Sequence, residues 1–140
     1  MKAFVLAEPG KVKWFDAPEP QLVPYGAILK PVAVTPCSSD VHTVFGGGSK
    51  KQDNLVLGHE CIAEVVSVGE NVCDFKTGDR VAVPAITPDW REKSIQEGND
   101  RHASAPFSGH QLGRTQPGVF SERFLIKDAD TTLAHIPQKI

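Results

Sequence analysis

Residues 58–83, GHECIAEVVSVGENVCDFKTGDRVAV, decide the fold that we expect for this chain. β-branched residues dominate the stretch 60–68, which is typical of a strand, and Gly69 closes it. The Gly78-Asp79 pair predicts a tight turn, and the apolar residues after it predict a second strand over 80–84. The stretch therefore indicates a strand-rich protein whose connections turn at glycine.

The sequence on either side continues this pattern of short strands. Further strands are expected over residues 2–7, 12–15, 27–35, 119–126 and 132–136. The first two form a hairpin across Pro9-Gly10, a strong turn signal. Pro31 indicates a sheet edge or a bulge in the third, because proline cannot donate a hydrogen bond to a strand ladder. We expect a mainly β protein.

Helices are predicted to be few and short, because proline interrupts most helical windows. One helix begins after Ser38 or Ser39, which suit an N-cap, with Asp40 in its first turn. Gly46-Gly47-Gly48 ends it. Residues 88–118 are polar and broken by glycine and proline, so we expect an irregular lobe there.

Composition excludes several functional classes. The chain has 140 residues, of which 40% are hydrophobic and 23% charged, as expected for one globular domain. A net charge of -2 argues against nucleic acid or an anionic membrane as the main partner. The three cysteines cannot all pair within the chain, and no apolar run suits a signal peptide or a membrane span. We expect reduced thiols and a cytoplasmic location.

Residues 37–42, CSSDVH, and Gly58-His59-Glu60 together hold thiolate, imidazole and carboxylate, the three ligand types of zinc. Cys37 precedes the predicted helix, whose N-terminal N–H groups favour a thiolate. His59 opens a strand, and Glu60 would point elsewhere along a regular strand unless the backbone bends. Three candidate ligands without a C-x-x-C pair fit a catalytic zinc, which keeps one position open.

Each candidate also has an ordinary structural explanation. Cys37 and His59 could be packing or surface residues, and Cys61 is best explained as a small core residue. Ser39 and His42 share one helix face and could pass a proton from a metal-bound oxygen to solvent. They could equally be an N-cap and a surface histidine.

Four motifs add a family resemblance that covers nearly the whole chain. Residues 37–42, 58–60 and 78–81, together with Gly69, resemble the N-terminal catalytic domain of zinc-containing medium-chain alcohol dehydrogenases. The run TPDW at 87–90 is most similar to the bacterial NADP-dependent secondary alcohol dehydrogenases. The resemblance implies a GroES-like β-barrel with short helices.

The same resemblance implies roles for individual residues. Cys37 and His59 would be zinc ligands, Glu60 a ligand that comes and goes, and Ser39 with His42 the proton relay. A substrate pocket would include Ala85, Ile86 and Trp90. The implied partners are a small alcohol or ketone, NADP or NAD held by a further domain, and a homotetrameric assembly.

Three departures from the family pattern qualify the resemblance. Ala63 stands where the family usually has glycine, and no cysteine lies in 89–118 to build a second, four-cysteine zinc site. No G-x-G-x-x-G motif follows a predicted strand, so we expect the cofactor domain to be missing. The resemblance also implies a further acidic zinc ligand shortly beyond residue 140. We therefore expect a piece of a longer enzyme that is inactive alone and binds zinc weakly or not at all.

Three other functions remain open from the sequence. A polyol or sugar dehydrogenase of the same superfamily would differ only in its pocket. A metal-free GroES-like binding module would hold no zinc. A zinc-free quinone or enoyl reductase is disfavoured by the pair of Cys37 and His59, since that branch generally lacks both.

Overall fold

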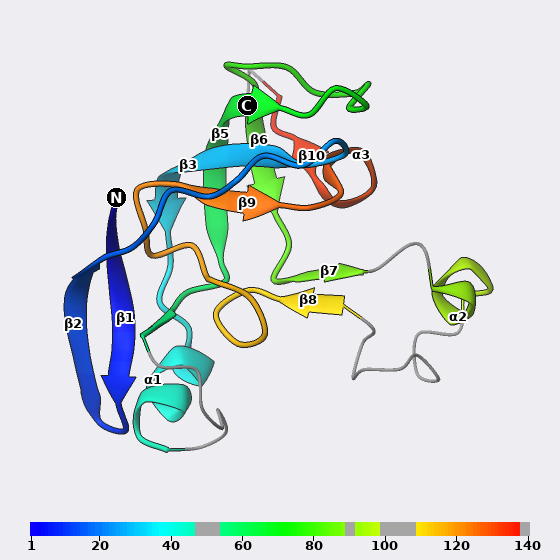
Figure 1. Ribbon diagram of the computed structural model, residues 1–140. Coiled ribbons are helices and arrows are strands. Elements are labelled where there is room, and N and C mark those ends of the chain that lie inside the picture. The colour runs from blue at the N-terminus through cyan, green and yellow to red at the C-terminus, as the bar shows by residue number, and fades with distance from the viewer. Residues whose placement is uncertain (47–53, 89–91, 99–108, 138–140) are drawn as a thin grey trace.

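A five-stranded antiparallel sheet contains both strands expected in residues 58–83, side by side (Figure 1). The computed structural model describes residues 1–46, 54–88, 92–98 and 109–137. The strands of the sheet are β10 (Ala134–His135), β6 (Arg80–Val83), β5 (Cys61–Val68), β3 (Ala27–Val34) and β9 (Phe124–Ile126), in that order. Alternate residues of β5 and β6 point into the core, where Ala63, Val65 and Val81 are fully buried. The strand prediction for this region is confirmed.

The N-terminal hairpin forms a second sheet beside the first. β1 (Lys2–Glu8) pairs with β2 (Lys11–Asp16) and, on its other edge, with β4 (Leu55–Val56). Gly10 has φ +78°, a left-handed conformation that glycine adopts at no steric cost, so the predicted turn is confirmed. The short strand β4 was not expected from the sequence.

Pro31 lies at a bulge, as predicted. The register between β3 and β5 shifts between Pro31 and Ala33. β9 pairs only with Ala27, Ile28 and Leu29 of β3. Pro31 therefore lies beyond the part of β3 that is paired on both sides, where its lack of an N–H costs no ladder bond.

Helix α1 (Ser38–Val44) corrects the expected N-cap. Cys37, and neither Ser38 nor Ser39, occupies that position, with extended backbone angles, while Asp40 lies in the first turn as predicted. Phe45 is the C-cap, and Gly46 follows with φ +98°, so the helix ends where expected. Gly47 and Gly48 lie outside the described residues.

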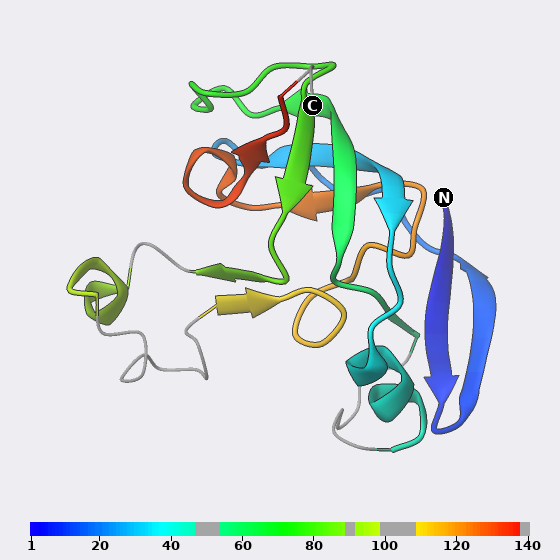
Figure 2. The same ribbon diagram turned by 180° about the vertical axis from the view of Figure 1, so that it is seen from behind.

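Several strands of the second half differ from prediction. β7 (Ile86–Pro88) pairs with β8 (Gly109–Gln111), a pairing not expected from the sequence, and the short helix α2 (Lys93–Gln96) lies between them in sequence, within the lobe expected over 88–118. Figures 1 and 2 show this ribbon leading away from the two sheets. Of the strand expected over 119–126, only β9 forms. The strand expected over 132–136 is wrong in its first part, because α3 (Ala129–Thr132) ends there before β10 begins.

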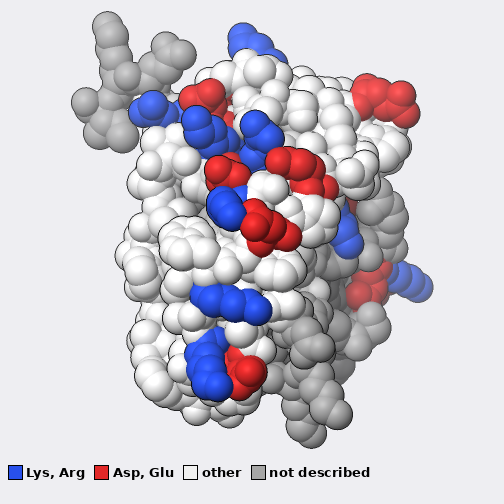
Figure 3. Space-filling view, turned by 60° about the vertical axis from the view of Figure 1, so that its left-hand side comes forward, with Lys and Arg blue, Asp and Glu red and all other residues white. Residues whose placement is uncertain are grey.

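Charged side chains of both signs lie on the surface. On the face shown in Figure 3, basic and acidic side chains are interleaved rather than gathered by sign. Among the described residues, no helix is long and apolar enough to cross a membrane.

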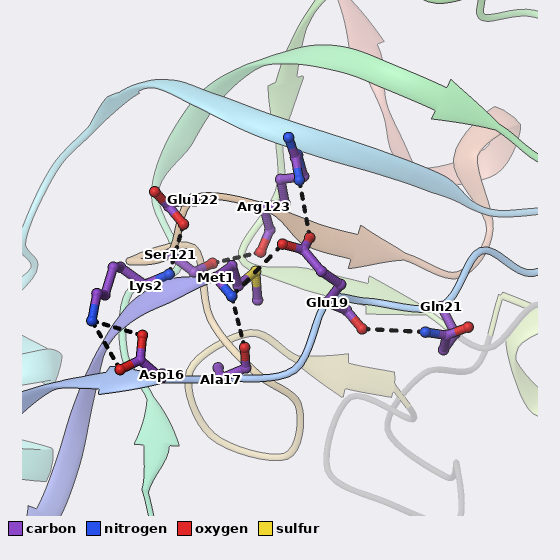
Figure 4. A network of polar contacts seen from close by, with 9 residues as sticks. All are labelled: Met1, Lys2, Asp16, Ala17, Glu19, Gln21, Ser121, Glu122 and Arg123. Carbon is purple, nitrogen blue, oxygen red and sulfur yellow. Dashed lines mark hydrogen bonds and ion pairs between the residues drawn. The ribbon is translucent and has the colours of Figure 1, made fainter.

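The chain's first residue is tied into the fold by a polar network (Figure 4). The Met1 amine donates a hydrogen bond to the Ala17 carbonyl at 2.9 Å and lies 3.7 Å from Glu19. The guanidinium of Arg123 pairs with the same Glu19 carboxylate at 3.1 Å. This network joins β1, the segment that follows β2 and the segment before β9.

Candidate metal centre and the adjoining cavity

Three ligand-type side chains converge where the chain passes from β3 to α1 and from β4 to β5. The Cys37 sulfur, an imidazole nitrogen of His59 and a carboxylate oxygen of Glu60 lie within 4.8 Å of one another. Cys37 and His59 are half-buried, whereas Glu60 is exposed. Residues far apart in sequence are therefore brought together as one possible metal site.

The backbone bend that brings Glu60 into this cluster begins at Gly58. Gly58 has φ +90°, and a Cβ there would collide with the Phe120 ring. β5 begins only at Cys61, so the alternation of a regular strand does not apply to His59 and Glu60. The Thr35 N–H donates to the Glu60 carbonyl at 3.1 Å and holds the bend against the end of β3.

Asp40 connects the two ligand-bearing segments, a role that sequence reasoning missed. Its side chain is buried, with 8% of the residue exposed. The carboxylate accepts hydrogen bonds from the Cys37 N–H at 2.9 Å and the Gly58 N–H at 3.2 Å. It also lies 3.4 Å from His59 Nδ1. The only signal in the sequence was an acid in the first turn of a helix that opens with a candidate ligand.

The position of Asp40 determines which nitrogen of His59 is available to a metal. A carboxylate beside Nδ1 accepts a hydrogen bond from the N–H at that nitrogen and so favours the tautomer with a bare Nε2. His59 Nε2 lies 3.3 Å from Ser39 Oγ, on the side of the ring away from Asp40. The arrangement is that of an imidazole ligand oriented by an outer carboxylate.

The two half-buried cysteines have opposite electrostatic surroundings. Hydrogen bonds from the Ser39 hydroxyl and backbone N–H, and then from His59, lower the pKa of the Cys37 thiol. Burial raises the pKa of Cys61 to about 11. Cys61 packs against the main core and is not in the ligand cluster, as its interpretation as a core residue predicts.

A cavity of about 300 Å³ adjoins the ligand cluster. Ser39 and His42 both line it, and so do His59, Ala85 and Ile86. Trp90, the third predicted pocket residue, lies outside the described residues. A further wall, which was not expected from the sequence, consists of Gln111, Leu112, Gly113 and Arg114.

The donor set fits zinc. Thiolate, imidazole and carboxylate are its usual protein ligands, and the lowered pKa of Cys37 favours the ligating form. Three ligands beside a cavity leave room for a substrate oxygen, as catalytic rather than structural zinc sites do. The arrangement can therefore hold a Lewis acid next to a small bound molecule.

The chain is similar in sequence to known alcohol dehydrogenases. An NADP-dependent isopropanol dehydrogenase from Thermoanaerobacter brockii is 48% identical over the whole chain, which spans 40% of that relative. The enzyme of the same name from Clostridium beijerinckii is 44% identical over 99% of the chain and 39% of its own length. The chain thus spans about 40% of the length of these relatives.

A solved structure shows the same fold. The apo form of zinc-dependent alcohol dehydrogenase 2 from Streptococcus pneumonia superposes with a TM-score of 0.84 at 30% identity, covering 99% of this chain and 39% of that one. The family model for the alcohol dehydrogenase GroES-like domain matches residues 24–138. The GroES-like fold expected from the motifs is confirmed, and the chain belongs to the family of alcohol dehydrogenase GroES-like domains.

Proposed function

We propose that this chain is the zinc- and substrate-binding part of an NADP-dependent secondary alcohol dehydrogenase. The observation that carries the proposal is the convergence of Cys37, His59 and Glu60 beside a cavity lined by Ser39 and His42. The names of the Thermoanaerobacter brockii and Clostridium beijerinckii relatives support the choice of NADP and of a secondary alcohol. A homotetramer in the cytoplasm remains part of the proposal.

Cys37 and His59 would hold the zinc, with Glu60 as a third, exchangeable ligand. Zinc, when bound, supplies a Lewis acid that polarises the alcohol oxygen and lowers its pKa. Asp40 fixes the imidazole of His59 and the backbone of Cys37, so both ligands keep their orientation without the metal. Glu60 is exposed, which suits a ligand that can leave.

Ser39 and His42 would move the substrate proton. Ser39 Oγ lies beside the ligand nitrogen of His59, so its hydroxyl can accept the proton of an alcohol bound next to the cluster. His42 follows one turn later on α1, lines the same cavity and is exposed to solvent. Its imidazole can pass the proton on to water.

The printed sequence contains no G-x-G-x-x-G motif after a strand, so we expect no hydride transfer from these 140 residues alone. Sustained oxidation of propan-2-ol by the purified 140-residue chain with NADP would contradict that expectation.

Metal binding tests the proposal directly. The metal-free full-length protein, to which this chain contributes the ligand cluster, is titrated with Co²⁺, whose bond to a thiolate gives a charge-transfer absorption, and zinc is then added as competitor. We expect the absorption in the wild type, its loss in Cys37→Ser, and its retention in Cys73→Ser, a matched exposed thiol outside the cluster. Equal spectra for wild type and Cys37→Ser would rule out the site and favour a metal-free binding module.

A further inference from the structure

Arg114, an exposed arginine, is one of the residues that line the cavity beside the metal centre. The backbone that carries it is held in a tight turn. The N–H groups of Arg114 and Thr115 both donate to the Gln111 carbonyl, at 3.2 and 3.0 Å. The Gly113 N–H donates to the Gln116 carbonyl at 3.0 Å. The position of Arg114 is therefore fixed by main-chain hydrogen bonds on both sides.

The same turn packs against the backbone that carries His59. Gly113 has φ +72°, and a Cβ there would lie 3.0 Å from both the nitrogen and the oxygen of Gly58. Arg114 thus follows a residue in close contact with the residue before His59. The backbone that carries Arg114 and the backbone that carries His59 are therefore packed against each other at one wall of the cavity.

The charge of Arg114 is not balanced within the cavity. Among the described residues that line it, the one carboxylate is Asp40, whose two oxygens already accept hydrogen bonds from Cys37 and Gly58. No carboxylate in the described part of the chain pairs with Arg114, whereas Arg123 pairs with Glu19 at 3.1 Å. A guanidinium stays protonated at every physiological pH and binds carboxylates with two parallel hydrogen bonds.

We propose that Arg114 binds a carboxylate of the substrate, and that the substrates are short hydroxy acids whose hydroxyl lies beside Ser39. This inference rests on the proposed function for its reaction but not for its binding step. A volume of about 300 Å³ corresponds to about ten water molecules and so to a compound of roughly ten non-hydrogen atoms.

Nuclear magnetic resonance of the ¹⁵N-labelled, metal-free 140-residue chain tests the binding step. The probes are 3-hydroxybutyrate, butan-2-ol as the uncharged analogue, and inorganic phosphate. We expect 3-hydroxybutyrate to shift the amide signals of Gly113 and His59 in a saturable way, and butan-2-ol to shift neither at equal concentration. Because no metal is present, a carboxylate cannot bind to zinc instead.

Two variants and a control assign the binding to Arg114. Arg114→Gln should weaken 3-hydroxybutyrate binding by about tenfold, as expected for a lost charge-assisted hydrogen-bond pair. Arg114→Lys keeps the positive charge but cannot make the two parallel hydrogen bonds of a guanidinium. This variant should lose only part of the affinity for 3-hydroxybutyrate. Arg80→Gln, which removes an exposed arginine that does not line the cavity, should leave the affinity unchanged.

Two results would overturn the inference. One is an unchanged dissociation constant in Arg114→Gln. The other is phosphate shifting Gly113 while 3-hydroxybutyrate leaves His59 unshifted, which would assign the guanidinium to a phosphate rather than to the substrate. The Co²⁺ titration tests the zinc proposal separately, because its outcome depends on Cys37 and not on Arg114.

Discussion

The Asp40 carboxylate accepts a hydrogen bond from the Gly58 N–H across 3.2 Å and so ties helix α1 to the turn that carries His59. A second hydrogen bond, from the Cys37 N–H at 2.9 Å, ties it to the other candidate ligand. One buried side chain thus sets the separation of the thiol and the imidazole before any metal arrives.

Asp40→Asn should weaken zinc binding by about 10- to 100-fold, because the amide is uncharged and orients the His59 imidazole less well. The measurement is competition against a chromophoric chelator. Asp130→Asn is the matched control, since the Asp130 carboxylate also accepts two backbone N–H groups, from Cys73 and Asp74, away from the cluster. An effect of equal size in both variants would show that Asp40 acts on general stability alone.

Gly58→Ala should destabilise the fold more than Gly78→Ala. Both glycines have nearly the same positive φ, +90° and +91°, so both substitutions incur the left-handed penalty of about 1–2 kcal/mol. Only at Gly58 would the new methyl collide with the Phe120 ring, which adds about 1–3 kcal/mol of overpacking. Urea unfolding of the two variants measures the difference, and equal free energies of unfolding would contradict the close packing at Phe120.

The raised pKa of Cys61 predicts a loss of stability at alkaline pH. In the unfolded chain the thiol ionises near its ordinary pKa of 9.0, whereas burial delays ionisation in the folded chain to about 11. The stabilisation is complete below pH 9 and is lost as the pH rises through about 11, because the unfolded state releases its proton first. Cys61→Val should unfold with a shallower dependence on pH in this window. Parallel curves for the two proteins would show that the site does not disfavour the thiolate.

Glu19→Gln should cost less than about 1 kcal/mol, although it removes two ion pairs. The Glu19 side chain is 50% exposed, so water and salt screen its attraction to the Met1 amine and to Arg123. Thermal unfolding at low and high salt measures the effect, which should shrink as salt is added. Glu8→Gln, at the exposed pair with Lys11, is the comparison. A larger loss of stability that does not change with salt would contradict the solvent exposure of the Glu19 carboxylate in the network of Figure 4.

Local signals in the sequence accounted for the parts of the fold that depend on neighbours along the chain. The Pro9-Gly10 turn, the bulge at Pro31 and the strands flanking Gly78 each follow from the conformations open to one or two residues. The motifs around Cys37 and His59 likewise identified three side chains that the structure brings together.

The remainder depends on contacts between distant segments. β4 has two residues, too few for a periodic pattern in the sequence. It forms because its backbone pairs with the free edge of β1. β7 and β8 pair across a polar region whose composition suggests only a loop. The role of Asp40 exists only once Gly58 lies beside α1, so no spacing along the chain could reveal it.

The contact of Gly113 with Gly58 joins the cavity wall to the ligand turn through main-chain atoms alone. A Cβ at Gly118 would lie still closer to the Gly58 carbonyl oxygen than the 3.0 Å of a Cβ at Gly113, so the turn at Gly58 is packed between two glycines. Substitutions at Ala85, Ile86 or Arg114 can therefore alter what the cavity accepts without displacing His59. The side chains that line the cavity can therefore vary between related proteins, and with them the substrate, while the main-chain contacts keep His59 in place.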